Sequence, residues 1–355
     1  MHTRPEELPA KVLAELARGI VQRLRAAGFA GFWVGGCVRD FLLGREPHDF
    51  DIATDGRPEQ VEALFPHTIP VGRQFGVVIV LERGQQFQVA TFRAEADYRD
   101  GRRPESVSFA NAEADAVRRD FTINGLFYDP LTETIHDWVG GQADLQRRRI
   151  RTIGRPEDRF AEDHLRMLRA VRFAAQLGFE IEADTLTAVQ RGAEKIRLIS
   201  AERVRDELVK LFRPPHAARG LRLLQESGLL EMILPELAAT LTCEQSRQFH
   251  PEGTVFNHIC LMLENLPGDA DPLLPWAVLL HDIAKPVTAT QDPGTGAIHF
   301  YGHEVVGADL AATILRRLKF PNRELERVVE AVRHHMQFMA ATQMRKATLR
   351  RFMLR

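Results

Sequence analysis

Residues 31–54 place a short apolar strand, two glycines, a helix and a second strand in close succession, and this order constrains the fold more than any other feature of the chain. The run GFWVGG predicts a buried strand that ends in a turn, CVRDFLLG predicts a helix closed by Gly44, and DFDIAT predicts a second strand. Gly35 and Gly36 let the backbone approach a ligand, and the N–H groups at the start of the following helix suit a polyphosphate. The segment therefore predicts an anion-binding turn in a domain that mixes strands and helices.

Two carboxylates lie at the start of the second predicted strand. Side chains two residues apart on a strand face the same side, so Asp49 and Asp51 are expected to project together while Phe50 enters the core. Two carboxylates and the oxygens of a triphosphate supply the hard ligands that Mg²⁺ requires, and such ions activate a hydroxyl and stabilise a leaving pyrophosphate. Taken separately, the glycines are an ordinary turn and the aspartates a capped strand end, but their adjacency favours the catalytic interpretation. The sequence contains neither a Walker phosphate loop nor a Rossmann glycine pattern, which disfavours those two nucleotide sites.

The rest of the pattern divides the chain into a mixed part and a helical part. Helical spacing over residues 8–28 and 57–65, and strands over 77–81 and 87–92, predict an α/β region that ends near residue 145. From Asp158 onward nearly every segment has helical period, with breaks at Gly178, Pro214–Pro215, Gly228, Pro235 and Pro251. Because 355 residues exceed what one hydrophobic core usually serves, two or three domains are expected.

The charge balance requires any nucleic-acid surface to be local. The chain carries 47 Lys and Arg against 48 Asp and Glu, so its net charge of −1 provides no long-range attraction for a polyanion. Arginines nevertheless outnumber acids between Arg147 and Arg172, which predicts a basic face there. The three cysteines form no metal-binding spacing and the N-terminal segment is charged, so we expect buried thiols in a soluble, cytoplasmic protein that does not interact with membranes.

The segment GGCVRDFLLGREPHDFDIAT resembles the active-site signature of the class II nucleotidyltransferases of the polymerase β superfamily, the group that contains bacterial CCA-adding enzymes and poly(A) polymerases. Later segments fit the same family in the same order: TFRAEADYRDGRRPESVSF, RRDFTINGLFYDP, AEDHLRMLRAVRFAAQLGFEI and ISAERVRDELVKLF. The resemblance implies an α+β fold, with a polymerase β-like head of mixed sheet and helices followed by an all-helical neck and body.

Asp163 and Arg166 are candidates for selecting the nucleotide without a nucleic-acid template. Their spacing of three predicts that they share a helix face, where the carboxylate accepts from the exocyclic amine of cytosine or adenine and the guanidinium donates to the ring acceptors. Uracil and guanine present hydrogen-bond donors and acceptors in the opposite arrangement. The resemblance implies this templating role, and the alternative is a surface ion pair.

Further nucleotide contacts are expected around these motifs. Arg169 and Arg172 continue the helical stripe of Arg166 and are predicted to contact the triphosphate. The resemblance makes Arg119 a nucleotide contact and Asp120 and Asn124 partners for the ribose, although Asp120 is also compatible with a helix cap and Asn124 with a turn. Arg39, beside Gly35 and Gly36, completes the predicted nucleotide site. One departure is Gln88, which stands where the superfamily often has a third acid.

A second set of metal ligands follows in the helical part. Its members occur in the order H…HD…H…HH and resemble the HD phosphohydrolase domain, a helical bundle that holds one or two divalent metals: His258, His281, Asp282, His303, His334 and His335. Several imidazoles favour a transition metal. The pattern usually ends in a further Asp, and no candidate precedes Arg355, so either a C-terminal tail is missing or the site is incomplete.

These observations predict a template-independent tRNA nucleotidyltransferase that uses CTP, ATP and Mg²⁺ to add C and/or A to a tRNA 3′ end. The alternatives are a poly(A) polymerase, an enzyme that adds only CC or only A, and, from another class, an HD phosphohydrolase or RNA-binding protein with a relic head. The expected domains are a nucleotidyltransferase head over 1–145, a helical neck and body over 146–240, and an HD-type domain over 241–355. The sequence leaves the oligomeric state open.

Overall fold

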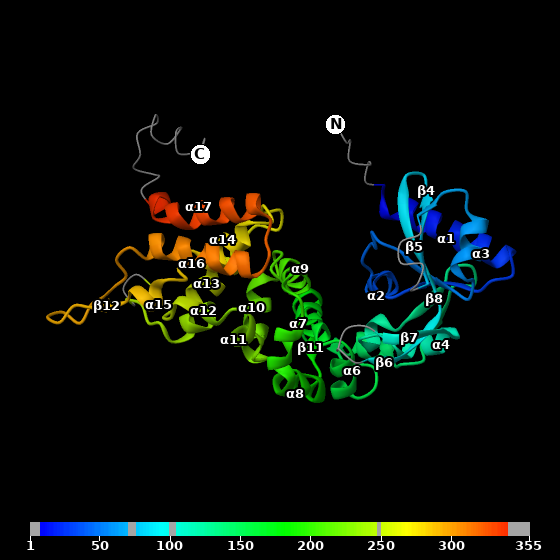
Figure 1. Ribbon diagram of the computed structural model, residues 1–355, viewed down its shortest axis with the longest axis horizontal. Coiled ribbons are helices and arrows are strands. Elements are labelled where there is room, and N and C mark those ends of the chain that lie inside the picture. Colours follow the sequence, from blue (N-terminus) through cyan, green and yellow to red (C-terminus); the bar gives the residue numbers. More distant parts are fainter. Residues whose placement is uncertain (1–7, 70–75, 99–103, 247–249, 340–355) are drawn as a thin grey trace. The chain divides into compact units, whose positions relative to one another are not determined.

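A computed structural model describes residues 8–69, 76–98, 104–246 and 250–339. The chain forms two compact units, which Figure 1 colours along the sequence. The first contains Met1–Arg166 together with Phe179–Ala188, and the second contains Met167–Gly178 together with Val189–Arg355.

A seven-stranded mixed sheet organises the first unit. Its strand order is β3-β4-β5-β2-β1-β8-β9, in which β2 and β5 are parallel and the other neighbours are antiparallel. The strands are β1 (Gly31–Val34), β2 (Asp51–Thr54), β3 (Thr68–Ile69), β4 (Val77–Glu82), β5 (Gln85–Thr91), β8 (Phe127–Asp129) and β9 (Thr134–His136). The parallel pair places the start of β2 beside β5, with Ile52 opposite Val89.

Helices and two smaller strand pairs complete the first unit. Helix α1 buries Leu13, Ala17, Ile20 and Leu24 on one face, the period-3.6 pattern that its sequence predicts. The helices are α1 (Ala10–Ala26), α2 (Gly36–Leu42), α3 (Pro58–Leu64), α4 (Ala112–Val117), η2 (Thr122–Asn124), α5 (Gly141–Gln146) and α6 (Pro156–Glu162). The strand pairs are β6 (Arg93–Tyr98) with β7 (Pro104–Phe109), and β10 (Arg149–Ile150) with β11 (Glu180–Ile181). Within the predicted TFRAEADYRDGRRPESVSF loop, residues 99–103 lie outside the described residues.

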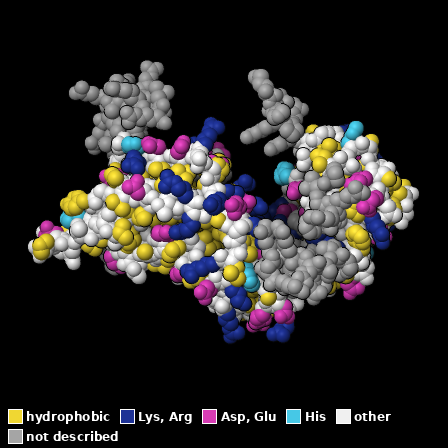
Figure 2. Space-filling model, viewed as in Figure 1, with side chains coloured by type: hydrophobic (Ala, Val, Ile, Leu, Met, Phe, Trp, Pro, Cys, Tyr) yellow, Lys and Arg dark blue, Asp and Glu magenta, His cyan; other side chains and the backbone are white. Residues whose placement is uncertain are grey.

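The second unit is predominantly helical. Its elements include most of α7 (Leu165–Leu177), the end of α8 (Ala183–Gly192), η3 (Ala193–Leu198), α9 (Ala201–Leu211), α10 (Ala217–Glu226), α11 (Leu229–Ile233), α12 (Pro235–Ala238) and η4 (Ala239–Thr242). They continue with α13 (Val255–Glu264), α14 (Leu274–Leu280), α15 (Lys285–Thr288), α16 (His303–Arg317) and α17 (Asn322–Met339). Figure 2 shows Lys and Arg side chains gathered over α9, the helix that carries Arg203, Arg205 and Lys210.

The structure confirms the predicted α+β class, a mixed sheet with helices followed by a helical body. The expectation of helix alone after Asp158 is wrong in detail, because β11 pairs with β10 and because β12 (Thr290–Gln291) and β13 (Ile298–His299) form a hairpin. Asp292 closes that hairpin by accepting hydrogen bonds from the backbone N–H groups of Gly294 and Thr295. None of the described helices is both long and apolar enough to cross a membrane.

Candidate functional site

The predicted glycine turn joins β1 to α2. Gly35 adopts φ 75° and ψ −129°, a conformation that side-chain-bearing residues rarely adopt, and its N–H donates to the Leu126 carbonyl at 3.3 Å. A Cβ atom at Gly35 would lie 3.1 Å from Nη1 of Arg119. Glycine therefore permits both the turn and the close approach of a cationic side chain.

The Asp49–Asp51 pair lies at the start of the interior strand β2, beside this turn, because Asp51 pairs with Val34 of β1. Strand β2 begins at Asp51, so the prediction that Asp49 is part of the strand is wrong, whereas Phe50 is buried as predicted and packs on Trp33. Burial and the charge of Asp49 raise the pKa of Asp51 to about 6, against the opposing effect of Arg119. Asp49 and Asp51 are therefore close enough to interact, and two neighbouring carboxylates form a donor set suited to a hard divalent cation.

A chain of hydrogen bonds connects Arg39, Asn124 and Asp120. Arg39 Nη1 donates to Asn124 Oδ1 at 2.8 Å, and Asn124 Nδ2 donates to Asp120 Oδ1 at 3.1 Å. The Nε and Nη2 edge of the Arg39 guanidinium donates to Asp40, with Nε 2.9 Å from Oδ1. Asp120 and Asn124 are both buried, and Asp120 also accepts from the Phe121 N–H. These contacts join α2 to the RRDFTIN segment, so both residues have a structural role in addition to the ribose contact predicted for them.

Asp115 is a buried carboxylate next to the predicted site, and the sequence interpretation missed it. It is 1% exposed, and its two carboxylate oxygens bind Arg118 at 2.6 Å and Arg119 at 2.9 Å. Burial raises the pKa of Asp115, but the two guanidinium groups outweigh burial and hold that pKa below its usual range. Asp115 lies on α4, three residues before Arg118 and four residues before Arg119. This helical spacing is the sequence signal that indicates ion pairs between Asp115 and the two arginines.

Asp163 and Arg166 both belong to the first unit, but they do not share a helix face as predicted. Asp163 lies between α6 and α7 in extended conformation, and its Oδ1 accepts from the Leu165 N–H at 3.1 Å, which caps α7. Arg166 binds the Glu162 carboxylate and donates to the carbonyl oxygens of Arg159 at 3.1 Å and Arg118 at 3.4 Å. These contacts hold Arg166 against the backbone next to Arg119.

Arg169 and Arg172 belong to the second unit and face Glu207. The Arg172 Nε lies 2.5 Å from Glu207 Oε2, with both side chains below 10% exposure, and the Arg169 Nη1 lies 3.7 Å from Oε1. Arg172 therefore forms a buried ion pair across 35 residues of sequence. Gln88 is exposed on β5, one residue before the Val89 that pairs with β2.

Four predicted HD residues meet around the Asp282 carboxylate. The distances to Asp282 Oδ2 are 3.1 Å for His281 Nε2 and 3.9 Å for His258 Nε2. On the other oxygen, Oδ1, His303 Nε2 lies at 3.4 Å and His335 Nε2 at 3.8 Å. Two groups that can hold a metal therefore share Asp282: one with His258 and His281, the other with His303 and His335.

Backbone contacts place a proton on Nδ1 of three of these imidazoles. The Nδ1 atoms of His281, His303 and His335 each lie 2.7 Å from the carbonyl oxygen three residues earlier in the chain. A carbonyl only accepts hydrogen bonds, so each Nδ1 carries a proton and Nε2 is the ring nitrogen left to bind a metal once it is deprotonated. The three Nε2 atoms, which face Asp282, are therefore the candidate metal-binding atoms of these rings.

The structure also corrects the membership of the HD cluster. His334 binds Glu330 at 3.2 Å and is absent from the metal-binding groups found among the described residues, because adjacent residues on α17 point in different directions. His250 and Glu252, which the sequence interpretation missed, join His258 in a further group. Lys285 Nζ is 2.8 Å from Asp282 Oδ2 and 2.7 Å from Gln245 Oε1.

Three family models match successive parts of the chain. The poly A polymerase head domain covers residues 31–151, the probable RNA and SrmB-binding site of polymerase A covers 178–241, and the HD domain covers 253–352. Asp49 and Asp51 lie within the first of these matches and the Asp282 cluster lies within the third, whereas residues 163–172 fall between matched segments. The matches to the head and HD domains indicate dependence on a divalent metal, and the groups that could hold a metal among the described residues lie in the HD region.

The relatives are CCA-adding enzymes. The chain is 49% identical over 223 residues to that of Geobacillus stearothermophilus, matching 62% of this chain but only 55% of the relative. It is 39% identical over 277 residues to that of Latilactobacillus sakei, which covers 76% of this chain and 69% of the relative. Among solved structures, the Bacillus stearothermophilus CCA-adding enzyme in complex with CTP aligns over 88% of this chain and 68% of its own, with 36% identity and a TM-score of 0.69. The chain thus spans about half the length of the first of these relatives, and its sequence, domain order and fold together establish that it belongs to the family of CCA-adding enzymes.

Proposed function

We propose that this chain is a template-independent tRNA nucleotidyltransferase that adds C and/or A to the 3′ end of tRNA from CTP and ATP, with release of pyrophosphate. The observation that carries the proposal is the Asp49–Asp51 pair beside the Gly35 turn and Arg119, in a domain that matches the poly A polymerase head. The relatives that bear the name CCA-adding enzyme support tRNA as the acceptor.

Catalysis is assigned to the two aspartates. Asp49 and Asp51 would hold Mg²⁺, which when bound supplies charge stabilisation for the attacking 3′-hydroxyl and for the leaving pyrophosphate. Arg119 faces the Gly35 turn and opposes the negative charge of Asp51, so its guanidinium is suited to bind phosphate oxygens. Asp115 holds Arg119 in that position.

The triphosphate and ribose contacts extend this arrangement. Gly35 and Gly36 allow close approach of the phosphates, and Arg39 with Asp120 and Asn124 forms the polar network beneath the turn. Arg169 and Arg172 are proposed as further phosphate contacts. Arg169 is the more accessible of these two, because its side chain is about one-third exposed whereas that of Arg172 is buried against Glu207.

Asp163 and Arg166 are proposed to recognise the base. The Arg166 guanidinium donates to two backbone carbonyls, which fixes its orientation, and Asp163 is held by its cap on α7. A rigid acceptor–donor pair discriminates between bases because the wrong base leaves buried polar groups unpaired. Cytosine and adenine fit this polarity.

The Asp282 cluster supports a second, metal-dependent function in the HD domain. Four imidazoles and one carboxylate suit a transition metal better than Mg²⁺. We propose that this site binds such a metal and that any phosphatase or 2′,3′-cyclic phosphodiesterase activity of the chain resides there, with the neutral imidazoles and Asp282 as ligands.

The decisive experiment supplies CTP, ATP, UTP or GTP singly to tRNAs that end before the first C, before the second C and before the terminal A. Incorporation of C and then A, and their loss in Asp49→Asn with tRNA affinity within a few-fold of wild type, is the expected result. Addition of only CC or only A identifies a partial enzyme, and long A tracts on generic RNA identify a poly(A) polymerase. Nucleotide addition at wild-type rate by Asp49→Asn refutes the catalytic assignment.

Two broader expectations remain part of the proposal. We retain a head over 1–145, a helical neck and body over 146–240 and an HD-type domain over 241–355. We also place the protein in the cytoplasm, because Cys37 and Cys260 are buried free thiols of the kind found in reducing compartments.

A further inference from the structure

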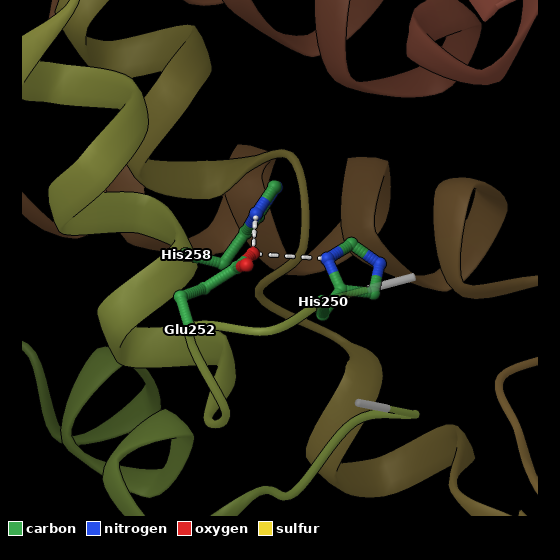
Figure 3. A group of neighbouring side chains, drawn as sticks. All are labelled: His250, Glu252 and His258. Carbon is green, nitrogen blue, oxygen red and sulfur yellow. Dashed lines mark hydrogen bonds and ion pairs between the residues drawn. The ribbon is translucent and has the colours of Figure 1, made fainter. Parts of the chain in front are cut away.

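The carboxylate of Glu252 lies between two imidazoles immediately before α13 (Figure 3). One oxygen, Oε1, is 2.7 Å from His258 Nδ1 and 3.0 Å from His250 Nδ1. The other nitrogen of His258, Nε2, faces Asp282 Oδ2 at 3.9 Å. His258 therefore connects Glu252 to the HD cluster.

His258 is held differently from the other three histidines of that cluster. His281, His303 and His335 each donate Nδ1–H to a backbone carbonyl, which no substitution removes. His258 instead donates to a side-chain carboxylate contributed by the preceding loop. A carboxylate acceptor both orients an imidazole and increases its strength as a metal ligand.

We propose that Glu252 is a positioning residue for the HD metal site, which fixes His258 in the Nδ1–H tautomer and so directs its Nε2 toward the metal shared with His281 and Asp282. His250 secures Glu252 through the second hydrogen bond to the same oxygen. The inference rests on the metal site proposed above for the HD domain.

A separate ion bound by His250, Glu252 and His258 is the competing interpretation of the same group. Such an ion would take the Nδ1 electron pair of His258 and displace the proton that the 2.7 Å hydrogen bond contains. His258 would then use Nδ1 for this ion while its Nε2 faces Asp282. In the positioning role, His258 Nδ1–H donates to Glu252 and Nε2 binds the metal, so one neutral ring satisfies both contacts.

The test titrates Co²⁺ into the metal-free full chain, with visible absorbance reporting affinity and elemental analysis after dialysis reporting stoichiometry. Glu252→Ala is expected to weaken Co²⁺ binding about 10- to 100-fold while the number of ions at saturation stays unchanged. Glu252→Gln keeps an acceptor oxygen and is expected to bind more tightly than Glu252→Ala. Glu264→Gln, which alters an exposed carboxylate on the same helix α13, is the matched control and is expected to bind like wild type.

Each other outcome is decisive. Equal Co²⁺ affinity in wild type and Glu252→Ala overturns the positioning role and leaves the metal site intact. Loss of one whole equivalent in both Glu252 variants, with unchanged affinity for the rest, makes Glu252 a ligand of its own ion and also overturns the role. Failure of wild type to bind Co²⁺ overturns the metal site and the inference together. If circular dichroism shows that Glu252→Ala is unfolded, His250→Ala replaces it, and unchanged affinity there overturns the inference.

Discussion

Replacing Asp51 by Asn should stabilise the first unit when no divalent cation is present. Burial and the neighbouring charge of Asp49 raise the pKa of Asp51 from 3.8 to about 6. A shift of about two units corresponds to about 3 kcal/mol, because one unit is worth about 1.4 kcal/mol. Asn has nearly the same shape and carries no charge, so Asp51→Asn should recover up to about 3 kcal/mol near pH 7.5.

The pH dependence of this gain follows from the direction of the shift. Because the folded pKa of Asp51 exceeds the unfolded one, the folded state binds the proton more tightly, and the penalty is fully present above about pH 6. The penalty decreases as the pH falls and is largely gone near pH 4, where the unfolded chain begins to bind the proton too. The advantage of Asp51→Asn should therefore shrink from about 3 kcal/mol to below about 1 kcal/mol between pH 7.5 and pH 4.

Hydrogen exchange of peptides from β1, β2 and β5 measures the difference in stability between wild type and Asp51→Asn. Both proteins are compared at the same pH, so the intrinsic exchange rate cancels and the ratio of exchange rates reports stability. In EDTA near pH 7.5, Asp51→Asn should slow exchange by up to about 100-fold. Added Mg²⁺ should protect wild type and leave the variant unchanged. The control Glu113→Gln alters an exposed carboxylate of the same unit and should change stability by less than about 0.5 kcal/mol. Faster exchange in Asp51→Asn than in wild type, or a gain that is independent of pH, would refute the electrostatic reasoning.

The remaining predictions concern the other charged groups. Asp163→Ala should reduce discrimination against UTP and GTP by one to two decades, about 1.5–3 kcal/mol, in single-nucleotide incorporation assays, while Asp163→Asn, which keeps the α7 cap, separates base recognition from helix stability. His281→Ala combined with Asp282→Ala should lower the content of bound transition metal, read by elemental analysis, and leave nucleotide addition largely intact; equal metal content in both proteins would make the cluster structural. Arg172→Ala should destabilise the second unit by about 1–3 kcal/mol in urea unfolding, because the buried Glu207 loses its closest cation and keeps only the longer contacts to Arg169 at 3.7 Å and Lys210 at 3.8 Å. A stability within about 0.5 kcal/mol of wild type would contradict the buried pair.

Local physics explains why much of the fold was predictable from the sequence. The strand, the glycine turn and helix α2 follow from apolar patterning and from a backbone conformation at Gly35 that favours glycine. The α1 helix and the β4–β5 hairpin follow from periodicity and from the Arg83–Gly84 turn, in which both residues have positive φ. Each of these features depends on residues close together in the chain.

Contacts between distant residues decided the rest. The sequence orders His334 and His335 side by side, but only the packing of α17 determines that His335 faces Asp282. Glu207 lies 35 residues from Arg172, and the polarity pattern of α7 alone does not reveal that this arginine is buried in an ion pair. By itself, the sequence determined the order of the elements, because the spacing of apolar residues sets the period of each helix or strand. It also determined which residue types are available for chemistry. The tertiary structure decided which of those side chains meet, because burial and charge pairing depend on which segments pack together.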